Sequence, residues 1–347
     1  MLILCHHPDS CQMKKKTSLK DIAQKVGVST ALVSYVLNNK KEGRISKDVA
    51  ARIREVAREM DYRTNQIARS LKTRKSQTIG LIVADISNPF FSRLARFIED
   101  EADKKGYTVI IGSSDEYQDK FRKLTDTFLD RQVDGLIIAA GAKTEKHLHY
   151  LVDNNIPFVL VDRYFPRLHT NYVALDNFSA AYKAVNYLLE KGRKNIGMIA
   201  YDTELHHLNE RKRGYQAALK DNKLPVLKGR LKEVALVNSE PAIEKAVAAL
   251  LAGKQPIDGL LLASSHIANS AVKMINSLSI KVPDELAIIS FDESEALDLF
   301  YAPITYMKQP LCEMAQLATN ILLDSIEKNN KITQINMEAE LIIRQSA

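Results

Sequence analysis

Several stretches of the chain place polar and aromatic side chains directly after short apolar runs. The stretches are 85–91 after TIGLIV, Asp162-Arg163 after VLV, Ser264-Ser265-His266 after LLLA and Asp292-Glu293 after ISF, with Arg211 and Gln309 as further candidates. Aromatic rings stack on the C–H faces of a sugar, while carboxylates, amides and guanidinium groups exchange hydrogen bonds with its hydroxyls. Together these residue types predict a sugar site. Taken singly, each could equally cap a helix or form a surface pair.

A second stretch, residues 19–37 (LKDIAQKVGVSTALVSYVL), predicts two short helices joined by a tight turn. Ser18 can cap the first helix and Gly27 can end it in a left-handed conformation, and Ser29 can cap the second. The outward positions of the second helix are Thr30, Ala31, Ser34 and Tyr35. This pattern predicts a helix-turn-helix whose second helix fits a DNA major groove, although an ordinary helical hairpin shares it.

The distribution of charge favours DNA binding. Residues 14–75 contain seventeen Lys or Arg and six Asp or Glu, a net charge of +11, whereas the whole chain carries +7. A basic N-terminal segment ahead of a mildly acidic remainder is typical of a nucleic-acid-binding head. The other interpretation of the same charges is a basic face that is merely solvated.

Length and composition exclude several classes of protein. A chain of 347 residues predicts two or three domains, and it contains no apolar run long enough to span a membrane. The opening MLIL is too short for a secretory signal, and Cys5, Cys11 and Cys312 make no disulfide framework. We therefore expect a cytoplasmic protein.

Residues 1–16 are expected to form a disordered leader, and Met13 is an alternative start. Zinc binding by this leader is disfavoured, because no second ligand pair with zinc-site spacing follows its Cys5, His6, His7 and Cys11. No metal or cofactor is expected elsewhere in the chain.

The elements that must position these residues follow from periodicity. A third helix, which Ser46 is expected to cap, completes the head. A short helix over 65–71 would fold only when paired with a second copy on DNA. Expected strands are 78–83, 107–111, 135–139, 158–161, 195–200, 259–263 and 287–291; expected helices are 90–105, 116–131, 144–154, 177–191, 209–222, 240–252 and 267–278. Continuously apolar strands between helices predict parallel sheets in two α/β lobes, with ligands at the carboxyl ends of the strands.

These motifs together resemble the LacI/GalR family of transcriptional repressors over residues 17–347. The resemblance is carried by TSLKDIAQKVGVST, VSYVLN, RISKDVAARI, ARSLK, TIGLIVADISNPFF, DGLII, VDR, NERKRGYQAAL, VPDELAIISFDE and KQP. The body also resembles the periplasmic ribose-type binding proteins, which lack the head. The implied fold is a three-helix helix-turn-helix head, a hinge helix and a periplasmic-binding-protein-like body of two parallel-sheet lobes.

The resemblance also implies domain boundaries and site residues. The domains would be a leader 1–16, a DNA-binding domain 17–62, a hinge 63–75 and a ligand-binding domain 76–347, with an N-lobe of 76–174 and 309–336 and a C-lobe of 175–308 and 337–347. The implied DNA-binding residues are Ser18, Ser29, Thr30, Ala31, Ser34, Tyr35, Asn65, Ala68 and Leu71, the last as a wedge in the minor groove. The implied effector-binding residues are Asn88, Phe90, Phe91, Asp162, Arg163, Arg211, Ser264, Asp292 and Gln309.

Three departures from the family pattern modify these expectations. Ser264-Ser265 replaces the Asn-Asp of sugar-binding relatives, which shortens the reach of the side chain and removes a two-way amide. Thr64 replaces the proline common before the hinge helix. The chain ends soon after Arg344 without a heptad tail, so a homodimer is expected rather than a tetramer.

The expected function is that of a ligand-responsive, sequence-specific DNA-binding regulator, a repressor that binds a pseudo-palindromic operator as a dimer. Its effector would be a sugar or a sugar derivative. A solute-binding protein of the ribose-binding type is the alternative, although it has no use for residues 17–75. An enzyme is disfavoured, because the chain has no phosphate loop, GxGxxG, HExxH or GxSxG motif.

Overall fold

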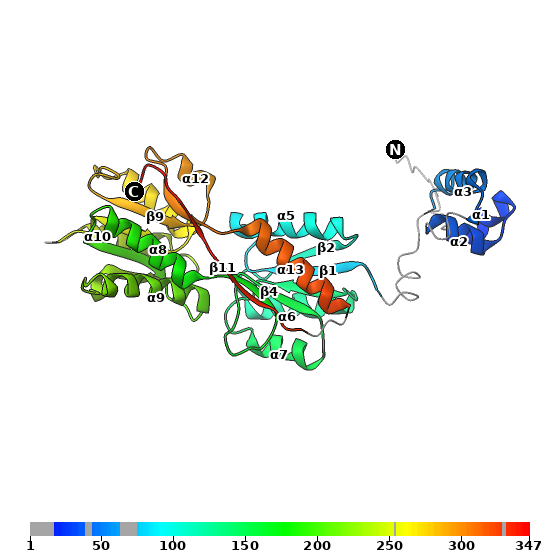
Figure 1. Ribbon diagram of the computed structural model, residues 1–347, viewed down its shortest axis with the longest axis horizontal. Coiled ribbons are helices and arrows are strands. Elements are labelled where there is room, and N and C mark those ends of the chain that lie inside the picture. The colour runs from blue at the N-terminus through cyan, green and yellow to red at the C-terminus, as the bar shows by residue number, and fades with distance from the viewer. Residues whose placement is uncertain (1–16, 39–43, 63–74, 253–254, 328–330) are drawn as a thin grey trace, which may run out of the picture. The chain divides into compact units, whose positions relative to one another are not determined.

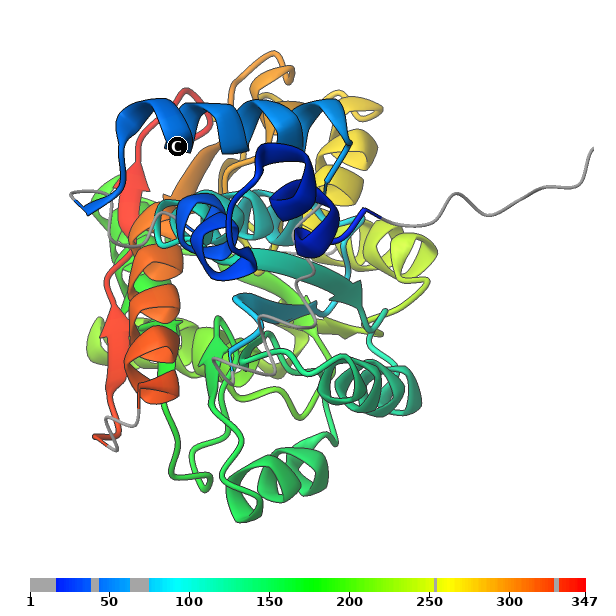
Figure 2. The same cartoon turned by 90° about the vertical axis from the view of Figure 1, so that its right-hand side faces the viewer.

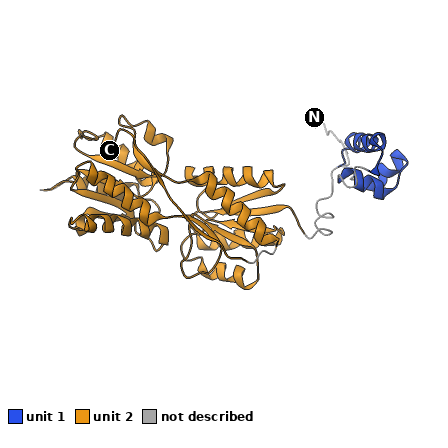
Figure 3. Ribbon diagram, in the orientation of Figure 1, with its two compact units in different colours: residues 1–74 blue, residues 75–347 orange. Residues whose placement is uncertain are grey.

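The chain forms two compact units, residues 1–74 and 75–347 (Figure 3). The computed structural model describes residues 17–38, 44–62, 75–252, 255–327 and 331–347. Within these ranges, no helix combines the length and the apolarity that a membrane crossing requires. The expected leader 1–16 and hinge helix 65–71 lie outside the described residues.

The first unit contains the three expected helices, α1 (Leu19–Val26), α2 (Thr30–Leu37) and α3 (Lys47–Glu59). A capping box starts α1, because the Asp21 backbone N–H donates to Ser18 Oγ at 3.3 Å while the Ser18 N–H donates to the Asp21 carboxylate at 2.8 Å. Gly27 ends α1 with φ 79°, a conformation that costs glycine little. Ser46 precedes α3, but its side chain makes no capping hydrogen bond, which corrects the sequence prediction.

The core of the head lies between these helices. Ile22, Val33 and Ile53 are fully buried, one from each helix. Their spacing leaves the opposite faces of the helices to solvent, so α2 can be packed on one side and exposed on the other.

The second unit is built on two six-stranded sheets, which Figure 1 shows side by side. The first sheet has the order β11-β5-β4-β3-β1-β2 and all its pairs are parallel. Its strands are β1 (Thr78–Val83), β2 (Thr108–Ser113), β3 (Gly135–Ile138), β4 (Phe158–Val161), β5 (Tyr172–Leu175) and β11 (Gln334–Met337).

The second sheet repeats this arrangement in the order β12-β10-β9-β8-β6-β7. Its strands are β6 (Ile196–Tyr201), β7 (Leu231–Val234), β8 (Gly259–Leu262), β9 (Ala287–Phe291), β10 (Thr305–Lys308) and β12 (Glu340–Ile342). Only the pairing of β12 with β10 is antiparallel, which departs from the expected wholly parallel lobe. In both sheets the strand order reverses beside the first strand of the lobe, and ligands bind at such switch points.

Helices cover both faces of each sheet. They are α5 (Pro89–Lys104), α6 (Gln118–Asp130), α7 (Glu145–Asp153), α8 (Asn177–Glu190), α9 (His206–Asp221), α10 (Glu240–Leu251), α11 (Ser265–Asn276), α12 (Glu295–Asp298), α13 (Leu311–Ile326) and the 3-10 helix Lys228–Arg230. On β1, Leu81 packs with α5 and α13, while its neighbour Ile82 packs with α6 and α7. Such alternation requires an apolar strand throughout, which is the pattern read from the sequence.

The chain passes between the two lobes three times, after β5, after β10 and between β11 and β12. In Figure 2, β11 and β12 follow one another along one edge of the body. Sequence reasoning missed five strands and two helices, namely β5, β7, β10, β11, β12, α12 and α13. The missed strands are of three or four residues, and β7, β10 and β11 carry polar residues, so they lack the apolar run by which the others were found.

Gly214 supplies a test of how closely α9 packs on α8. A Cβ at this position would stand 2.2 Å from the Phe178 carbonyl oxygen, a backbone atom that cannot move aside. We expect Gly214→Ala to destabilise the body by about 2 kcal/mol or more in urea unfolding, because overpacking forces the two helices apart.

Gly229→Ala is the matched control, since a Cβ there meets nothing within 4 Å. Equal unfolding midpoints for the two variants would contradict the close approach of α8 and α9.

Candidate functional site

The carboxyl ends of strands from both sheets border one cleft of about 450 Å³. All nine residues expected to bind an effector line it: Asn88, Phe90, Phe91, Asp162, Arg163, Arg211, Ser264, Asp292 and Gln309. They come from six places in the sequence, and the two sheets bring them together. The structure therefore assembles this predicted set in one cavity.

The start of α5 supplies the apolar wall of the cleft. Asn88 caps this helix, with its Oδ1 accepting from the Phe90 N–H at 3.0 Å. The rings of Phe90 and Phe91 pack edge to face with centroids 5.0 Å apart, and both are almost wholly buried. Because the cap fixes the first turn, both rings are held at the border of the cleft.

A charged cluster lies at the end of β4. Arg163 donates from Nη1 and Nη2 to the two carboxylate oxygens of Glu116, each at 2.8 Å, and its guanidinium lies 5.3 Å from the Phe91 ring centroid. Asp162, with φ 66°, has its carboxylate 3.6 Å from Arg163 Nε. Burial raises the pKa of Asp162 to about 6, against the opposing effect of Arg163 and Arg211.

The second lobe contributes a matching cluster. Arg211 donates to Asn177 Oδ1 at 2.7 Å and to the Ala263 carbonyl at 2.6 Å, and its guanidinium covers the Phe291 ring at 3.9 Å. Gln309 Nε2 donates to Asp292 Oδ1 at 2.6 Å. Within the described residues, the buried Gln309 Oε1 and Arg163 Nε have no hydrogen-bond partner. An unpaired buried acceptor and donor at one cleft are places where a ligand hydroxyl can bind.

Ser264 both lines the cleft and caps a helix. Its Oγ accepts from the Ile267 N–H at 3.2 Å, which caps α11, and lies 3.4 Å from the Tyr201 hydroxyl. Ser265 and His266 also line the cleft, and His266 Nε2 stands 3.6 Å from Glu240.

Sequence reasoning missed several lining residues, among them Glu116, Tyr201 and His207. Glu116 and Tyr201 stand at the ends of strands like the residues that were found, and His207 lies one helical turn before Arg211. Burial lowers the pKa of His207 well below its usual value, with Arg163 and Arg211 adding to the effect, so the ring is neutral at pH 7.

Two side-chain contacts join the lobes beside the cleft. Arg93 of α5 pairs with Glu293, which follows β9, at 2.5 Å. The Tyr164 hydroxyl lies 3.1 Å from His206 Nε2 at the start of α9. Contacts of this kind change when the lobes move, so the cleft can be coupled to a change in their arrangement.

The head exposes the face of α2 that was expected to contact DNA. Ser29, Thr30, Ala31 and Tyr35 are exposed and Ser34 is half-buried, whereas Val33 and Val36 on the opposite side are buried. The Ser18 hydroxyl donates to the Asp21 carboxylate at 2.7 Å within the capping box.

Other predicted residues fall outside the described ranges. These are Asn65, Ala68 and Leu71 of the expected hinge, and the Cys5, His6, His7 and Cys11 group. Among the described residues, no three His, Cys, Asp or Glu side chains are grouped so that they could hold a metal ion.

Each of the two units contains a segment that matches a known protein family. Residues 18–65 match the family of bacterial regulatory proteins described as the lacI family, and residues 185–347 match the periplasmic binding protein-like domain. The chain is 31% identical to the ribose operon repressor of Halalkalibacterium halodurans over 334 residues, which cover 95% of this chain and 97% of that protein. It is 33% identical to the HTH-type transcriptional repressor CytR of Escherichia coli over 331 residues, 95% of this chain and 96% of that one.

Solved structures agree with this fold. The transcription regulator CcpA of Lactococcus lactis is 26% identical, with a TM-score of 0.71 over 78% of this chain and 98% of that one. The lac repressor dimer bound to operator and an anti-inducer is 19% identical, with a TM-score of 0.85 over 96% of this chain and 99% of that one, and shows the fold alone. The expected fold class is confirmed.

The raised pKa of Asp162 predicts a stability cost with a definite pH dependence. Its pKa rises from 3.8 to about 6 on folding, so between these values the folded chain binds the proton more tightly and stability falls as pH increases. We expect Asp162→Asn to stabilise the body by up to about 3 kcal/mol at pH 7.5, by about half that at pH 5, and by little below pH 4.

Urea unfolding at pH 7.5 and pH 5 measures this gain. Asp100→Asn, an exposed carboxyl on α5, is the control and should change the free energy of unfolding by less than about 0.5 kcal/mol at either pH. A gain for Asp162→Asn that is equal at both pH values would contradict the burial cost.

Proposed function

Because the chain belongs to the LacI family of bacterial regulatory proteins and is a DNA-binding transcriptional regulator, we propose that its cleft binds a sugar-like effector and that the exposed face of α2 reads the operator. The observation that supports this most strongly is that all nine residues singled out for effector binding line one cleft. The relatives named as repressors favour repression as the direction of control.

The cleft has the groups that a sugar requires. Phe90 and Phe91 offer apolar surface for C–H faces, and Asp162 and Asp292 can accept hydrogen bonds from hydroxyls. The unpaired Gln309 Oε1 would accept from one hydroxyl, and Arg163 Nε would donate to the oxygen of another. A polyol can satisfy both kinds of group at once because each hydroxyl is a donor and an acceptor.

The position of Gln309 links the cleft to the path of the chain between lobes. Gln309 directly follows β10 and precedes α13, so it stands on the second crossover, and it is hydrogen-bonded to Asp292 of the second lobe. An effector that binds these two residues would bias the arrangement of the lobes at this crossover. The resulting coupling between effector and operator is reciprocal and typically amounts to about 1–3 kcal/mol.

On DNA, we propose a homodimer in which each α2 enters a major groove at one half-site. Thr30, Ala31 and Tyr35 would face base edges, and Ser18, Ser29 and Ser34 would contact phosphates. The segment with Asn65, Ala68 and Leu71 would bind the minor groove between the half-sites. Such a regulator acts where the chromosome is, so we propose the cytoplasm as its location.

A solute-binding protein is not favoured, since residues 18–65 match the lacI family and α1 and α2 form a helix-turn-helix. Catalysis is not proposed, because the named relatives are transcriptional regulators.

Tyr35 tests the assignment of α2. Using an operator selected by the protein from a random duplex library, we expect Tyr35→Ala to weaken binding at least tenfold, because a base-contacting group is lost. Tyr150→Ala removes an exposed tyrosine of the body and should leave operator affinity unchanged. Electrophoretic mobility shifts measure both, and equal affinities would refute the assignment.

Asp292 tests the cleft. A thermal-shift panel of neutral pentoses, hexoses and disaccharides identifies a stabilising sugar, whose effect on operator binding is then titrated. Asp292→Asn should abolish that effect while operator affinity without sugar is retained, since Asn tolerates the φ of 69° but loses the carboxylate. Asp202→Asn, an exposed residue directly after β6, is the control. A normal dose-response in Asp292→Asn would exclude the proposed site.

A further inference from the structure

We propose that the cleft selects an uncharged, hydroxyl-rich effector, that it excludes the corresponding sugar acids and sugar phosphates, and that Glu116 is the residue that sets this selectivity. The inference rests on the effector site proposed above and names the class of ligand that the site takes.

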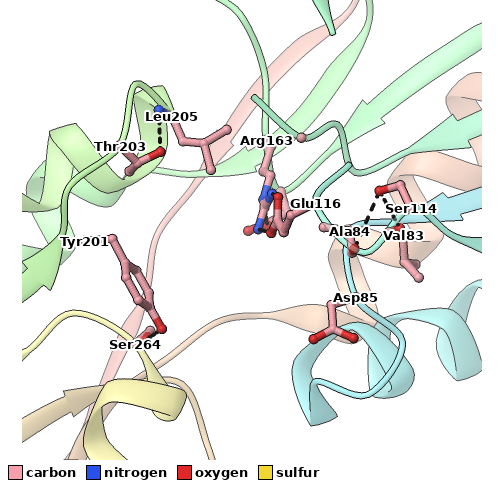
Figure 4. A network of polar contacts seen from close by, with 12 residues as sticks. Val83, Ala84, Asp85, Ser114, Glu116, Arg163, Tyr201, Thr203, Leu205 and Ser264 are labelled. Carbon is pink, nitrogen blue, oxygen red and sulfur yellow. Dashed lines mark hydrogen bonds and ion pairs between the residues drawn. The ribbon is translucent and has the colours of Figure 1, made fainter. Parts of the chain in front are cut away.

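Arg163 is the group on which the selectivity depends. A guanidinium with a free edge binds carboxylates and phosphates through two parallel hydrogen bonds. In this cleft the Nη1–Nη2 edge is already occupied, because both groups of Arg163 donate to the two oxygens of Glu116 at 2.8 Å each, and on the other edge Nε lies 3.6 Å from the Asp162 carboxylate. Figure 4 shows the two side chains against each other, with Tyr201 and Ser264 on the opposite lobe. Glu116 thus takes the position that an anionic group of a ligand would need.

Glu116 is held firmly in this position. Its backbone N–H donates to the Ala84 carbonyl at 3.1 Å, at the end of β1. Asp115 and Glu116 both adopt left-handed conformations, with φ of 50° and 62°, a region that Asp tolerates and that is unfavourable for Glu. A Cβ added at Gly141 would lie 3.4 Å from Glu116 Oε2, so the carboxylate also packs against the end of β3. The surrounding backbone therefore fixes the carboxylate beside Arg163.

Arg211 is no substitute for a free Arg163. Its Nε and Nη1 donate to Asn177 Oδ1 and to the Ala263 carbonyl, and its guanidinium plane covers the Phe291 ring. These contacts orient Arg211 within its lobe and use its Nε–H and one N–H of Nη1. The edge that includes Nε is therefore not free to bind an anion through two parallel hydrogen bonds.

The charge balance of the cleft points the same way. Of the described residues that line it, Arg163 and Arg211 are the only arginine or lysine side chains, and burial keeps His207 neutral. The lining carboxylates are Asp85, Asp115, Glu116, Asp162, Glu240 and Asp292. An excess of negative charge with low-dielectric walls repels an anion and does not penalise a neutral ligand.

Entry of an anion would require one of two unfavourable changes. Either Glu116 would leave Arg163 and remain buried without its partner, or the anion would bind beside an uncompensated carboxylate. A neutral polyol needs neither change, because it binds Arg163 Nε and Gln309 Oε1, two buried atoms of the cleft that have no hydrogen-bond partner among the described residues.

The test compares sugars in pairs that differ by charge, on the full-length protein. The pairs are D-glucose with D-glucuronate, D-galactose with D-galacturonate, and D-ribose with D-ribose 5-phosphate, each measured by thermal shift and calorimetry at constant ionic strength. For the wild-type chain we expect binding of the neutral member of at least one pair and none of the anionic members. Anionic binding that equals or exceeds neutral binding in the wild type would overturn the proposal, and this comparison needs no variant.

Glu116→Gln tests the role of the residue itself. Loss of the negative charge frees Arg163, so we expect this variant to gain at least tenfold in affinity for an anionic member. Glu240→Gln makes the same chemical change at an exposed carboxylate of the same cleft that does not contact Arg163, so its gain in affinity for anions should be much smaller. Equal gains in the two variants, or a gain in neither, would refute the specific role of Glu116.

Operator binding separates this inference from the proposed function. A neutral sugar that binds in the cleft without changing operator affinity would contradict effector control and support the selectivity. An anionic sugar that binds in the cleft and changes operator affinity would support effector control and contradict the selectivity. Retained operator affinity in Glu116→Gln and Glu240→Gln shows that the variants are folded.

Discussion

The pairing of charges buried between the two lobes is the constraint on which the structure of the body depends. Asp162, Arg163, Arg211 and Asp292 are all less than a tenth exposed, and a charge removed from water is tolerated only with a partner or a hydrogen bond. Their partners come from distant parts of the chain, since Glu116 follows β2, Asn177 begins α8 and Gln309 follows β10. The order of the strands in both sheets is what brings these partners to one place.

This pairing is incomplete in a way that is useful for binding. Burial raises the pKa of Asp162, and Gln309 Oε1 and Arg163 Nε have no partner among the described residues. A body selected only for stability would have removed these unfavourable groups, because buried unpaired polar atoms cost free energy. Their retention at the switch points of two sheets fits a site that is completed by a ligand. The cost to the free protein becomes part of the preference for the bound state.

The head obeys a different constraint. Its small core, centred on Ile22, Val33 and Ile53, has to hold three helices while one side of α2 stays exposed. A core of this size is marginal, and the capping of α1 and α2 contributes to it by satisfying backbone N–H groups that would otherwise lack partners. The caps at the helix starts therefore help to stabilise the head. Its outward residues are free to differ between regulators that read different operators.

The fold class and nine of the residues that line the cleft could be predicted from the sequence. Apolar strands alternating with amphipathic helices required parallel sheets, and the polar residues at strand ends had to lie together because parallel strands end on one edge. Tertiary structure alone decided the pairing within the cleft. Glu116 and Arg163 are 47 residues apart, and nothing local in either segment indicates that the two side chains form a bidentate pair. The short edge strands were likewise decided by their neighbours, since segments such as LKEV and QINM are too short for their pattern to predict a strand and become strands where a sheet offers an edge to pair with.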